Sequence, residues 1–267
     1  MAGVFLCLSS LAAFQKEFRV YLSLERYDNV ELPPDADEKT EFVFARLMFP
    51  STKFTRYSPR FADWRLGGTS WSEDYPRADR HFMMALRRLT RIHARSVEQP
   101  VNPDDGDDIF NWPMIYAGLP GDWDLTDAQA AKLREYFGRG GYFLADDFWG
   151  TPEWNPFMDG INKIFGDREP VDLPNNDALF HISYDLNDRY QVLGDWGLRG
   201  GRPYRNDGDT PYWRGIYDDK KRVMVAIVYN SDLGDSWEWA DSPLYPEKYS
   251  ALGIRIGVNY VLYGMTH

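Results

Sequence analysis

The run of residues 140–150, GGYFLADDFWG, constrains the fold more than any other part of the chain. Its apolar centre is short and is bounded by glycine on both sides, which favours a buried strand over a helix. Two adjacent carboxylates, Asp146 and Asp147, end this strand, and Phe148 and Trp149 lead into an aromatic-glycine turn. We therefore take this run as the centre of the fold.

Helix signals flank the predicted strand on both sides. The spacing of Thr126 and Gln129 is that of a capping box, and the helix that begins there is expected to end at Gly138. After the strand, Thr151 and the proline that follows it are typical of a helix start, and this second helix is expected to extend to about residue 165. The order helix, strand, turn, helix indicates an α/β sheet, in which ligands tend to bind at the carboxyl ends of the strands.

We interpret residues 41–267 as a single α/β domain, preceded by an apolar segment and an extended arm over residues 1–40. No Ser/Gly-rich linker or repeat divides the chain. Residues 166–214 are rich in Gly, Asp, Asn and Pro, which is typical of a functional loop or an insertion. Elsewhere the patterns predict strands at residues 41–49, 112–118 and 179–182, helices over about 74–92 and 248–263, a hairpin at 215–228 and a turn around 235–241.

Charge and cysteine content exclude several classes of site. The chain has 30 Lys and Arg against 41 Asp and Glu, a net charge of −11. Nucleic-acid binding requires a basic surface, and because no basic run is present we expect no nucleic-acid partner. The single cysteine, Cys7, excludes a disulfide, a zinc cluster or an iron–sulfur centre within one chain. Nucleotide-binding glycine motifs are also absent, so we expect no cofactor.

The N-terminus carries an apolar run over residues 3–13 that includes Cys7. A bilayer span requires about 20 apolar residues, so this run is too short to cross a membrane. It is similar to the apolar core and small-residue end of an export signal, although the positive charges that precede such a core are missing. We expect an exported, periplasmic or membrane-associated protein that can contact a membrane through residues 3–14. A segment that packs on the body of the protein is the alternative.

Several motifs together resemble a bacterial family, the domain of unknown function 4159. They are EFVFARL at 41–47, DYPRAD at 74–79, LREY at 133–136, the glycine pair and DDFWG of the central run, NSDLGDSWEW at 230–239, and NY at 259–260 with the final TH. The resemblance covers about residues 41–267. It implies a three-layer flavodoxin-like sandwich, similar to class I glutamine amidotransferases, with a mostly parallel sheet and loop insertions. Members of the family are mostly envelope proteins, and the resemblance implies no reaction.

The strand-to-helix turn does not offer a covalent nucleophile. An amidotransferase needs a cysteine at this position, with a histidine base nearby, and this chain has Asp146, Asp147 and Phe148 there instead. No Gly-x-Ser-x-Gly motif is present either, so we assign no catalytic residue. Three of the histidines, at positions 81, 93 and 181, are expected to be core or surface histidines and not ligands, and the role of His267 stays open.

The two central carboxylates have two interpretations. Together with Asp235, Glu238 and Asp241 in another turn, and with the four histidines, they can bind a hard cation or serve as an acid/base pair. The interpretation that we prefer is structural: Asp147 caps the following helix, and Asp146 pairs with an arginine such as Arg77 or Arg80. No metal ligand is therefore assigned.

A second candidate patch is the alternating segment Trp237-Glu238-Trp239, with Asp235 before it. On a turn, the two rings can be presented to a sugar, a peptide or a protein partner. The alternative is that they close the edge of the sheet over Phe148 and Trp149. The candidate binding residues are thus Asp146, Asp147, Phe148, Trp149, Asp235, Trp237, Glu238 and Trp239.

These observations favour a protein that acts through binding. The leading hypothesis is a non-catalytic accessory or scaffold protein of the bacterial envelope, docked on the periplasmic face of a larger membrane protein complex such as a respiratory or photosynthetic assembly. The alternative is a carboxylate- or metal-dependent hydrolase, or a carbohydrate-binding protein, that uses the cleft at Asp146 and Asp147.

Overall fold

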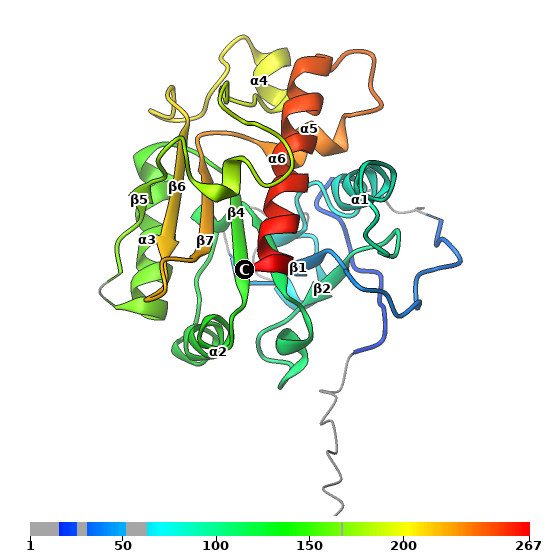
Figure 1. Cartoon of the computed structure of the whole chain (residues 1–267), viewed down its shortest axis with the longest axis vertical. Helices are drawn as coiled ribbons and strands as arrows, with labels where there is room; N and C mark the ends of the chain where they lie inside the picture. Colours follow the sequence, from blue (N-terminus) through cyan, green and yellow to red (C-terminus); the bar gives the residue numbers. More distant parts are fainter. Residues whose placement is uncertain (1–15, 26–30, 52–62, 167) are drawn as a thin grey trace, which may run out of the picture.

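In the part of the chain that the structure describes, seven strands form one sheet with helices on both faces (Figure 1). This computed structural model describes residues 16–25, 31–51, 63–166 and 168–267. The strands are β1 Ala45–Leu47, β2 Gln99–Val101, β3 Met114–Gly118, β4 Tyr142–Phe148, β5 Val171–Asp172, β6 Tyr212–Tyr217 and β7 Val223–Tyr229. The helices are α1 Arg77–Leu89, α2 Asp127–Gly138, α3 Gly150–Phe165, α4 Asp195–Gly200, α5 Leu233–Glu238 and α6 Glu247–Thr266.

The sheet is mostly parallel, as predicted. Strands β2, β1, β3, β4 and β7 lie in that order and are parallel, and β6 and β5 continue the sheet in antiparallel pairs. The central run forms β4, in which Ala145 pairs with Ala117 of β3 on one side and with Ile227 of β7 on the other. Because β3, β4 and β7 are parallel, their carboxyl ends meet at one edge of the sheet.

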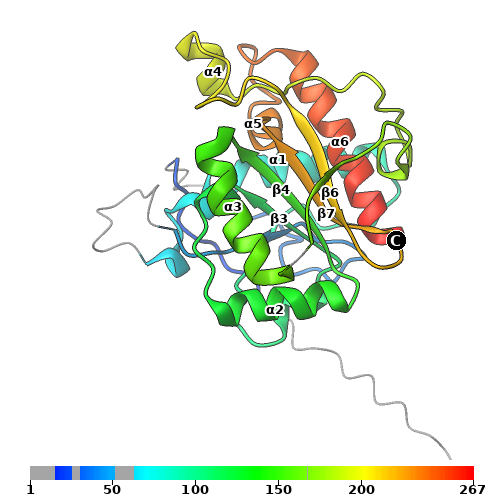
Figure 2. The ribbon, with the colours of Figure 1, turned by 90° about the vertical axis from the view of Figure 1, so that its left-hand side faces the viewer.

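Two separate cores lie on the two faces of the sheet. Side chains of a strand alternate between its faces, so Tyr142 and Leu144 of β4 join one core while Phe143 and Ala145 join the other. The first core packs against α1, α5 and α6, and the second packs against α2 and α3. Figures 1 and 2 show α2 and α3 on one side of the sheet and α1 and α6 on the other. The result is a three-layer α/β/α arrangement.

The helices that flank β4 begin close to the predicted residues. The capping box before α2 is present: Thr126 accepts a hydrogen bond from the backbone N–H of Gln129, and the Gln129 side chain accepts one from the N–H of Thr126. After α2, Gly140 adopts a φ of 98°, a conformation that only glycine adopts easily. The helix after the strand, α3, begins at Gly150, one residue before the predicted cap at Thr151.

Other local predictions are wrong. Residues 179–182 do not form a strand; Ala178–Phe180 is a 3-10 turn, because the side chain of Asp177 accepts a hydrogen bond from the N–H of Leu179 and closes it. The predicted turn around residues 235–241 contains helix α5 instead, and the side chain of Asp232 caps it through the N–H of Asp235 at 2.7 Å. Strand β2, which contains Pro100, was not predicted; it lies at the edge of the sheet, where proline is tolerated.

The described part of the N-terminal arm lies against the domain. The carbonyl of Leu22 accepts a hydrogen bond from the N–H of Gly68 at 2.8 Å, and the Asp35 carboxylate accepts one from the N–H of Ser96 at 3.0 Å. The predicted export signal, with Cys7, lies outside the described residues. Within the described ranges, none of the helices combines the length and the apolar character that a membrane span needs.

Candidate functional site

Asp146 lies at the carboxyl end of β4 and is completely buried. Its carboxylate accepts hydrogen bonds from the backbone N–H groups of Leu233 (3.1 Å) and Gly234 (2.9 Å) in the first turn of α5, and from the hydroxyl of Tyr116 on β3 (3.1 Å). Burial raises the pKa of Asp146 to about 7, although these hydrogen bonds act in the opposite direction. Asp146 therefore joins β4 to α5 and titrates near neutral pH.

The predicted pairing of Asp146 with an arginine of α1 is wrong. Arg77 pairs with Asp241 at 2.8 Å, and Arg80 pairs with Glu98 at 3.1 Å. Backbone N–H groups and a tyrosine hydroxyl bind the Asp146 carboxylate instead.

Asp147 occupies the strand-to-helix turn in a left-handed conformation, with a φ of 53°. The pairing register of β4 shifts between Ala145 and Phe148, which marks a bulge at this point. The Oδ1 atom of Asp147 accepts hydrogen bonds from the indole N–H of Trp149 and from Nη2 of Arg205, both at 2.7 Å. Burial raises the pKa of Asp147 well above its usual value, and the neighbouring Arg205 only partly offsets this effect.

The predicted helix cap by Asp147 is also wrong. The N–H of Trp149 donates to the Glu153 side chain at 2.8 Å, and the N–H of Gly150 donates to the Asn230 side chain at 2.8 Å. These two side chains bind the amide of the N-cap residue Trp149 and the first amide of α3, while the bulge places the Asp147 carboxylate against Arg205.

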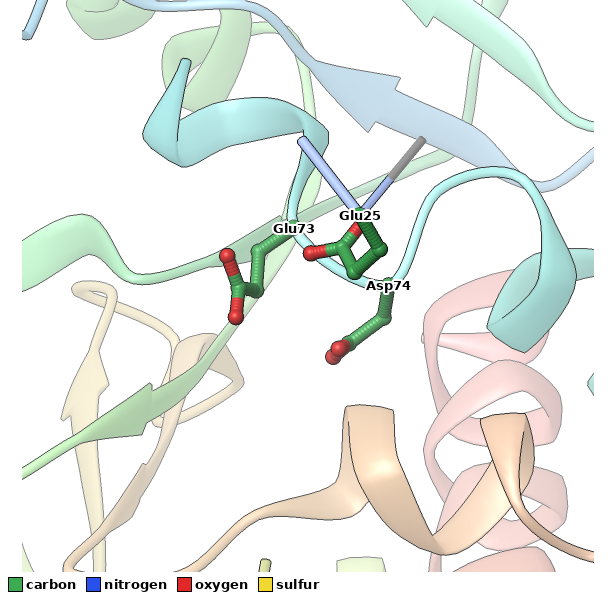
Figure 3. Close-up of side chains that lie close together, drawn as sticks. All are labelled: Glu25, Glu73 and Asp74. Carbon is green, nitrogen blue, oxygen red and sulfur yellow. The ribbon is translucent and has the colours of Figure 1, made fainter. Parts of the chain in front are cut away.

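Five further carboxylates gather close to this edge of the sheet, and we call them the acidic cluster: Glu25, Glu73, Asp74, Asp235 and Glu238. One oxygen each from Glu25, Glu73 and Asp74 lies within 4.8 Å of the others, and Figure 3 shows these three side chains together. The same holds for Asp74, Asp235 and Glu238. Asp74 belongs to both groups, and neither group of described residues contains a histidine or cysteine.

Asp74 is a buried and poorly compensated member of the acidic cluster. It is only 5% exposed, and none of the described residues donates a hydrogen bond to its carboxylate. Burial raises the pKa of Asp74 well above its usual value, and the charges of Asp235 and Glu238 raise it further. Burial and the adjacent Glu25 likewise raise the pKa of Glu73 well above its usual value. A buried charge is costly unless it is paired, so the free protein holds these carboxylates together at the expense of stability.

A buried ion pair fixes the segment that carries Glu73 and Asp74. Arg46 on β1 binds Asp79 on α1 through hydrogen bonds of 2.8 and 2.6 Å, and both side chains are 0% exposed. The same guanidinium donates to the backbone carbonyls of Trp71 (3.1 Å) and Glu73 (3.0 Å). The position of the acidic cluster therefore depends on a rigid, completely buried group.

Backbone strain is concentrated at the same edge. Left-handed φ values occur at Leu119 (51°) after β3, at Asp147 (53°) in β4, at Asn230 (61°) after β7 and at Asp74 (57°). Such conformations cost of order 1–3 kcal/mol each in residues other than glycine, less for Asp and Asn, and they tend to occur at functional sites. The chain thus adopts an unfavourable local geometry where the strand ends and the acidic cluster meet.

The two tryptophans predicted to form an exposed patch lie in different environments. Trp237 is only 1% exposed and stacks on Phe82 of α1 with ring centroids 4.5 Å apart. Trp239 is partly buried and lies under the guanidinium of Arg77, at 4.8 Å. The prediction that both rings are presented to a ligand is therefore wrong. The alternative, that the rings close the edge of the sheet over Phe148 and Trp149, is also wrong for Trp237, because its ring packs on the α1 side of the sheet while Phe148 lies in the other core.

The other predicted site residues divide into two sets. Asp235 and Glu238 belong to the acidic cluster together with residues that were not predicted, namely Glu25, Glu73 and Asp74. Phe148 and Trp149 are completely buried and pack against other aromatic rings. The sequence predicts Asp74 only as the start of a helix, but the two adjacent carboxylates Glu73 and Asp74 are a local signal that could have indicated a site. No local sequence pattern indicates Glu25 as a site residue, because only the tertiary fold brings the N-terminal arm next to Glu73 and Asp74.

The chemistry of the cluster is that of oxygen ligands. Carboxylate oxygens suit hard cations such as Ca²⁺ and Mg²⁺, whereas Zn²⁺ sites are usually built with histidine or cysteine. At the strand-to-helix turn the side chain is a carboxylate that is bound to Arg205 and Trp149, so this position supplies no thiol or hydroxyl nucleophile.

Comparison with known proteins identifies the family. No curated protein is significantly similar to the chain in sequence. The profile of one family, described as a domain of unknown function (DUF4159), matches residues 60–265, which include α1, all the central strands after β1, and the Asp74, Asp235 and Glu238 group. This match covers most of the chain and confirms the resemblance seen in the sequence motifs. The chain belongs to the DUF4159 family.

Proposed function

We propose that this protein binds a hard divalent cation, of the class of Ca²⁺ and Mg²⁺, at Asp74, Asp235 and Glu238, and acts through that binding. The observation that carries the proposal is Asp74: a carboxylate that is only 5% exposed, faces two other carboxylates and receives no hydrogen bond from the described residues. A bound cation would supply the missing positive charge. It would also lower the raised pKa of Asp74, because an adjacent cation favours the ionised form.

The position of the site agrees with the proposed fold. We propose a flavodoxin-like arrangement, because the parallel strands β1, β2, β3, β4 and β7, counted along the chain, lie in the order 2-1-3-4-5. Ligands of such sheets bind outside the carboxyl ends of the strands. The acidic residues of α5 lie there, since α5 follows β7 and its first amides bind Asp146 of β4.

A role in binding is favoured over covalent catalysis. The turn that carries the nucleophile in amidotransferases holds Asp147, which is engaged by Arg205 and Trp149.

The proposed accessory role in an envelope assembly rests on two features of the sequence alone: the apolar N-terminus and the missing nucleophile. Size-exclusion chromatography of solubilised native membranes tests it, and a protein that elutes only as a free monomer would contradict it.

Calorimetric titration and thermal unfolding test the cation proposal. Metal-free protein is titrated with CaCl₂ and, separately, MgCl₂, beside the variants Asp74→Asn and Asp188→Asn. Asparagine tolerates the left-handed backbone of residue 74, so the first change removes charge with little strain. Asp188 is exposed and outside the cluster, which makes it the matched control.

The expected result is saturable binding by the parent and the control, and at least a tenfold loss of affinity in Asp74→Asn. A cation at 100 times its Kd should stabilise the parent by about 2.7 kcal/mol, with little effect on Asp74→Asn. If the parent shows no heat of binding and no stabilisation with either cation, the proposed function is wrong.

A further inference from the structure

We propose that a groove at the amino-terminal edge of the sheet binds a small organic anion, of the class of a phosphate ester with an apolar body. The groove has a volume of about 590 Å³ and lies between the end of α2, the end of α3 and the turn at residues 218–222 that joins β6 to β7. We call it the basic groove. Its volume is in the range of small-molecule sites.

The basic groove is separate from the acidic cluster. Helix α2 leads into β4, and the turn at residues 218–222 leads into β7. Because β4 and β7 are parallel neighbours, their amino ends meet at one edge of the sheet, opposite the edge at which Asp146 and α5 lie. Figure 2 shows the end of α2, the β6–β7 turn and the C-terminus close together. The inference therefore does not depend on the proposed cation site.

Five cationic side chains line the basic groove: Arg134, Arg139, Arg168, Lys220 and Arg222. Three of them form ion pairs, Arg139 with Glu135 at 2.5 Å, Arg168 with Asp219 at 2.6 Å and Arg222 with Asp218 at 3.0 Å. Within the described part of the chain, neither Arg134 nor Lys220 forms an ion pair with a carboxylate, including the one at the last residue, His267. Two unpaired positive charges thus face one groove of a protein whose net charge is −11.

Arg134 is held in place for an anion. Its Nε and Nη2 atoms donate to the backbone carbonyls of Ile164 (2.5 Å) and Lys163 (2.6 Å) at the end of α3. These bonds fix the guanidinium, and among the described residues no partner binds its Nη1 atom. The carbonyls of a helix end account for one cation at this place. They do not account for Lys220, whose ammonium contacts no acceptor of the described residues.

The base of the basic groove is apolar. It contains Phe137, which is 5% exposed, and Met224, which is 4% exposed. The partly buried ring of Phe165 packs on Phe137, with ring centroids 5.0 Å apart. Sites for small molecules combine an apolar lining with a few polar groups that fix orientation. An organic anion can cover these rings while its charged group meets Arg134 and Lys220, whereas an inorganic ion can use only the charges.

Calorimetric titration of the full-length chain with phenyl phosphate tests the inference, in buffer without divalent cations. Inorganic phosphate and phenol, titrated separately, represent the two halves of this probe. The variant Lys220→Gln removes one unpaired charge of the basic groove. The matched control is Lys221→Gln, because Lys221 is the next residue of the same turn, is also exposed and does not line the groove.

We expect saturable binding of one phenyl phosphate per chain. Burial of its ring should make this binding roughly tenfold or more tighter than that of inorganic phosphate. Lys220→Gln should weaken the binding by about two- to fivefold, the worth of one exposed charge pair, and Lys221→Gln should not change it. No saturable binding of phenyl phosphate, equal affinity for inorganic phosphate or for phenol, or equal affinities of the two variants would overturn the inference. None of these outcomes bears on the cation site.

Discussion

Replacing Asp79 by asparagine should destabilise the protein by about 3–5 kcal/mol, the usual cost of breaking one half of a buried ion pair. Asp79 and Arg46 are both 0% exposed, and two hydrogen bonds of 2.8 and 2.6 Å join them. The asparagine would keep the size of the side chain, but it would remove the negative charge and turn an N–H₂ group toward the guanidinium. Arg46 would then be a buried cation without a counter-charge.

The expected loss is large enough to measure in two ways. In a chain of this size, 1 kcal/mol corresponds to about 2–4 °C in Tm, so Asp79→Asn should melt roughly 6–20 °C below the parent. Urea unfolding followed by circular dichroism should give a lower midpoint with an unchanged slope. The control Asp188→Asn, which changes an exposed aspartate, should stay within about 0.5 kcal/mol of the parent.

The result also bears on the acidic cluster. Arg46 donates to the carbonyl of Glu73 at 3.0 Å, so a displaced guanidinium should loosen the segment that carries Glu73 and Asp74. Cation affinity should therefore fall in Asp79→Asn even under conditions in which the variant is folded. A loss of stability below about 1 kcal/mol, well under the usual cost of breaking a buried pair, would refute the view that this pair is a structural centre of the site.

Three further predictions concern charge and packing. Asp74→Asn should stabilise the cation-free protein at pH 7, because it removes a carboxyl group whose pKa is raised by burial and by the neighbouring acids. A lower urea midpoint for this variant than for the parent would contradict the prediction. The cation-free protein should lose stability as the pH rises from about 4 to 7, because the pKa of Asp146 is about 7 in the folded protein and about 3.8 in the unfolded chain. Urea midpoints at pH 5 and pH 7.5 measure this loss, and the difference between the two midpoints should be smaller in Asp146→Asn. Gly257→Ala should destabilise the protein by about 1–3 kcal/mol, because the new Cβ would lie 2.4 Å from the Phe82 ring. In the control Gly138→Ala the new Cβ has no atom within 4 Å, so a thermal melt should show a neutral or slightly stabilising effect.

The central part of the fold could be predicted because its signals are local. Glycines bound β4, and the capping box of Thr126 and Gln129 starts α2, so neighbours in the sequence determine both boundaries. The mostly parallel sheet followed from the alternation of helices and strands. The strand predicted at residues 179–182 is wrong although the competing signal is also local: the apolar run is short, and the side chain of Asp177, two residues before Leu179, closes a 3-10 turn there.

The sequence by itself determined that this chain is an acidic α/β protein whose central strand ends in two carboxylates and offers no cysteine nucleophile. Only the tertiary structure decided what those carboxylates contact and which acids gather beside them. Asp146 is bound by amides that lie 87 and 88 residues further along the chain, and Asp74 faces Asp235 and Glu238 across a still larger gap in sequence. The environment of a buried carboxylate depends on which elements pack around the end of its strand, and contacts between such distant residues leave no periodic pattern in the sequence.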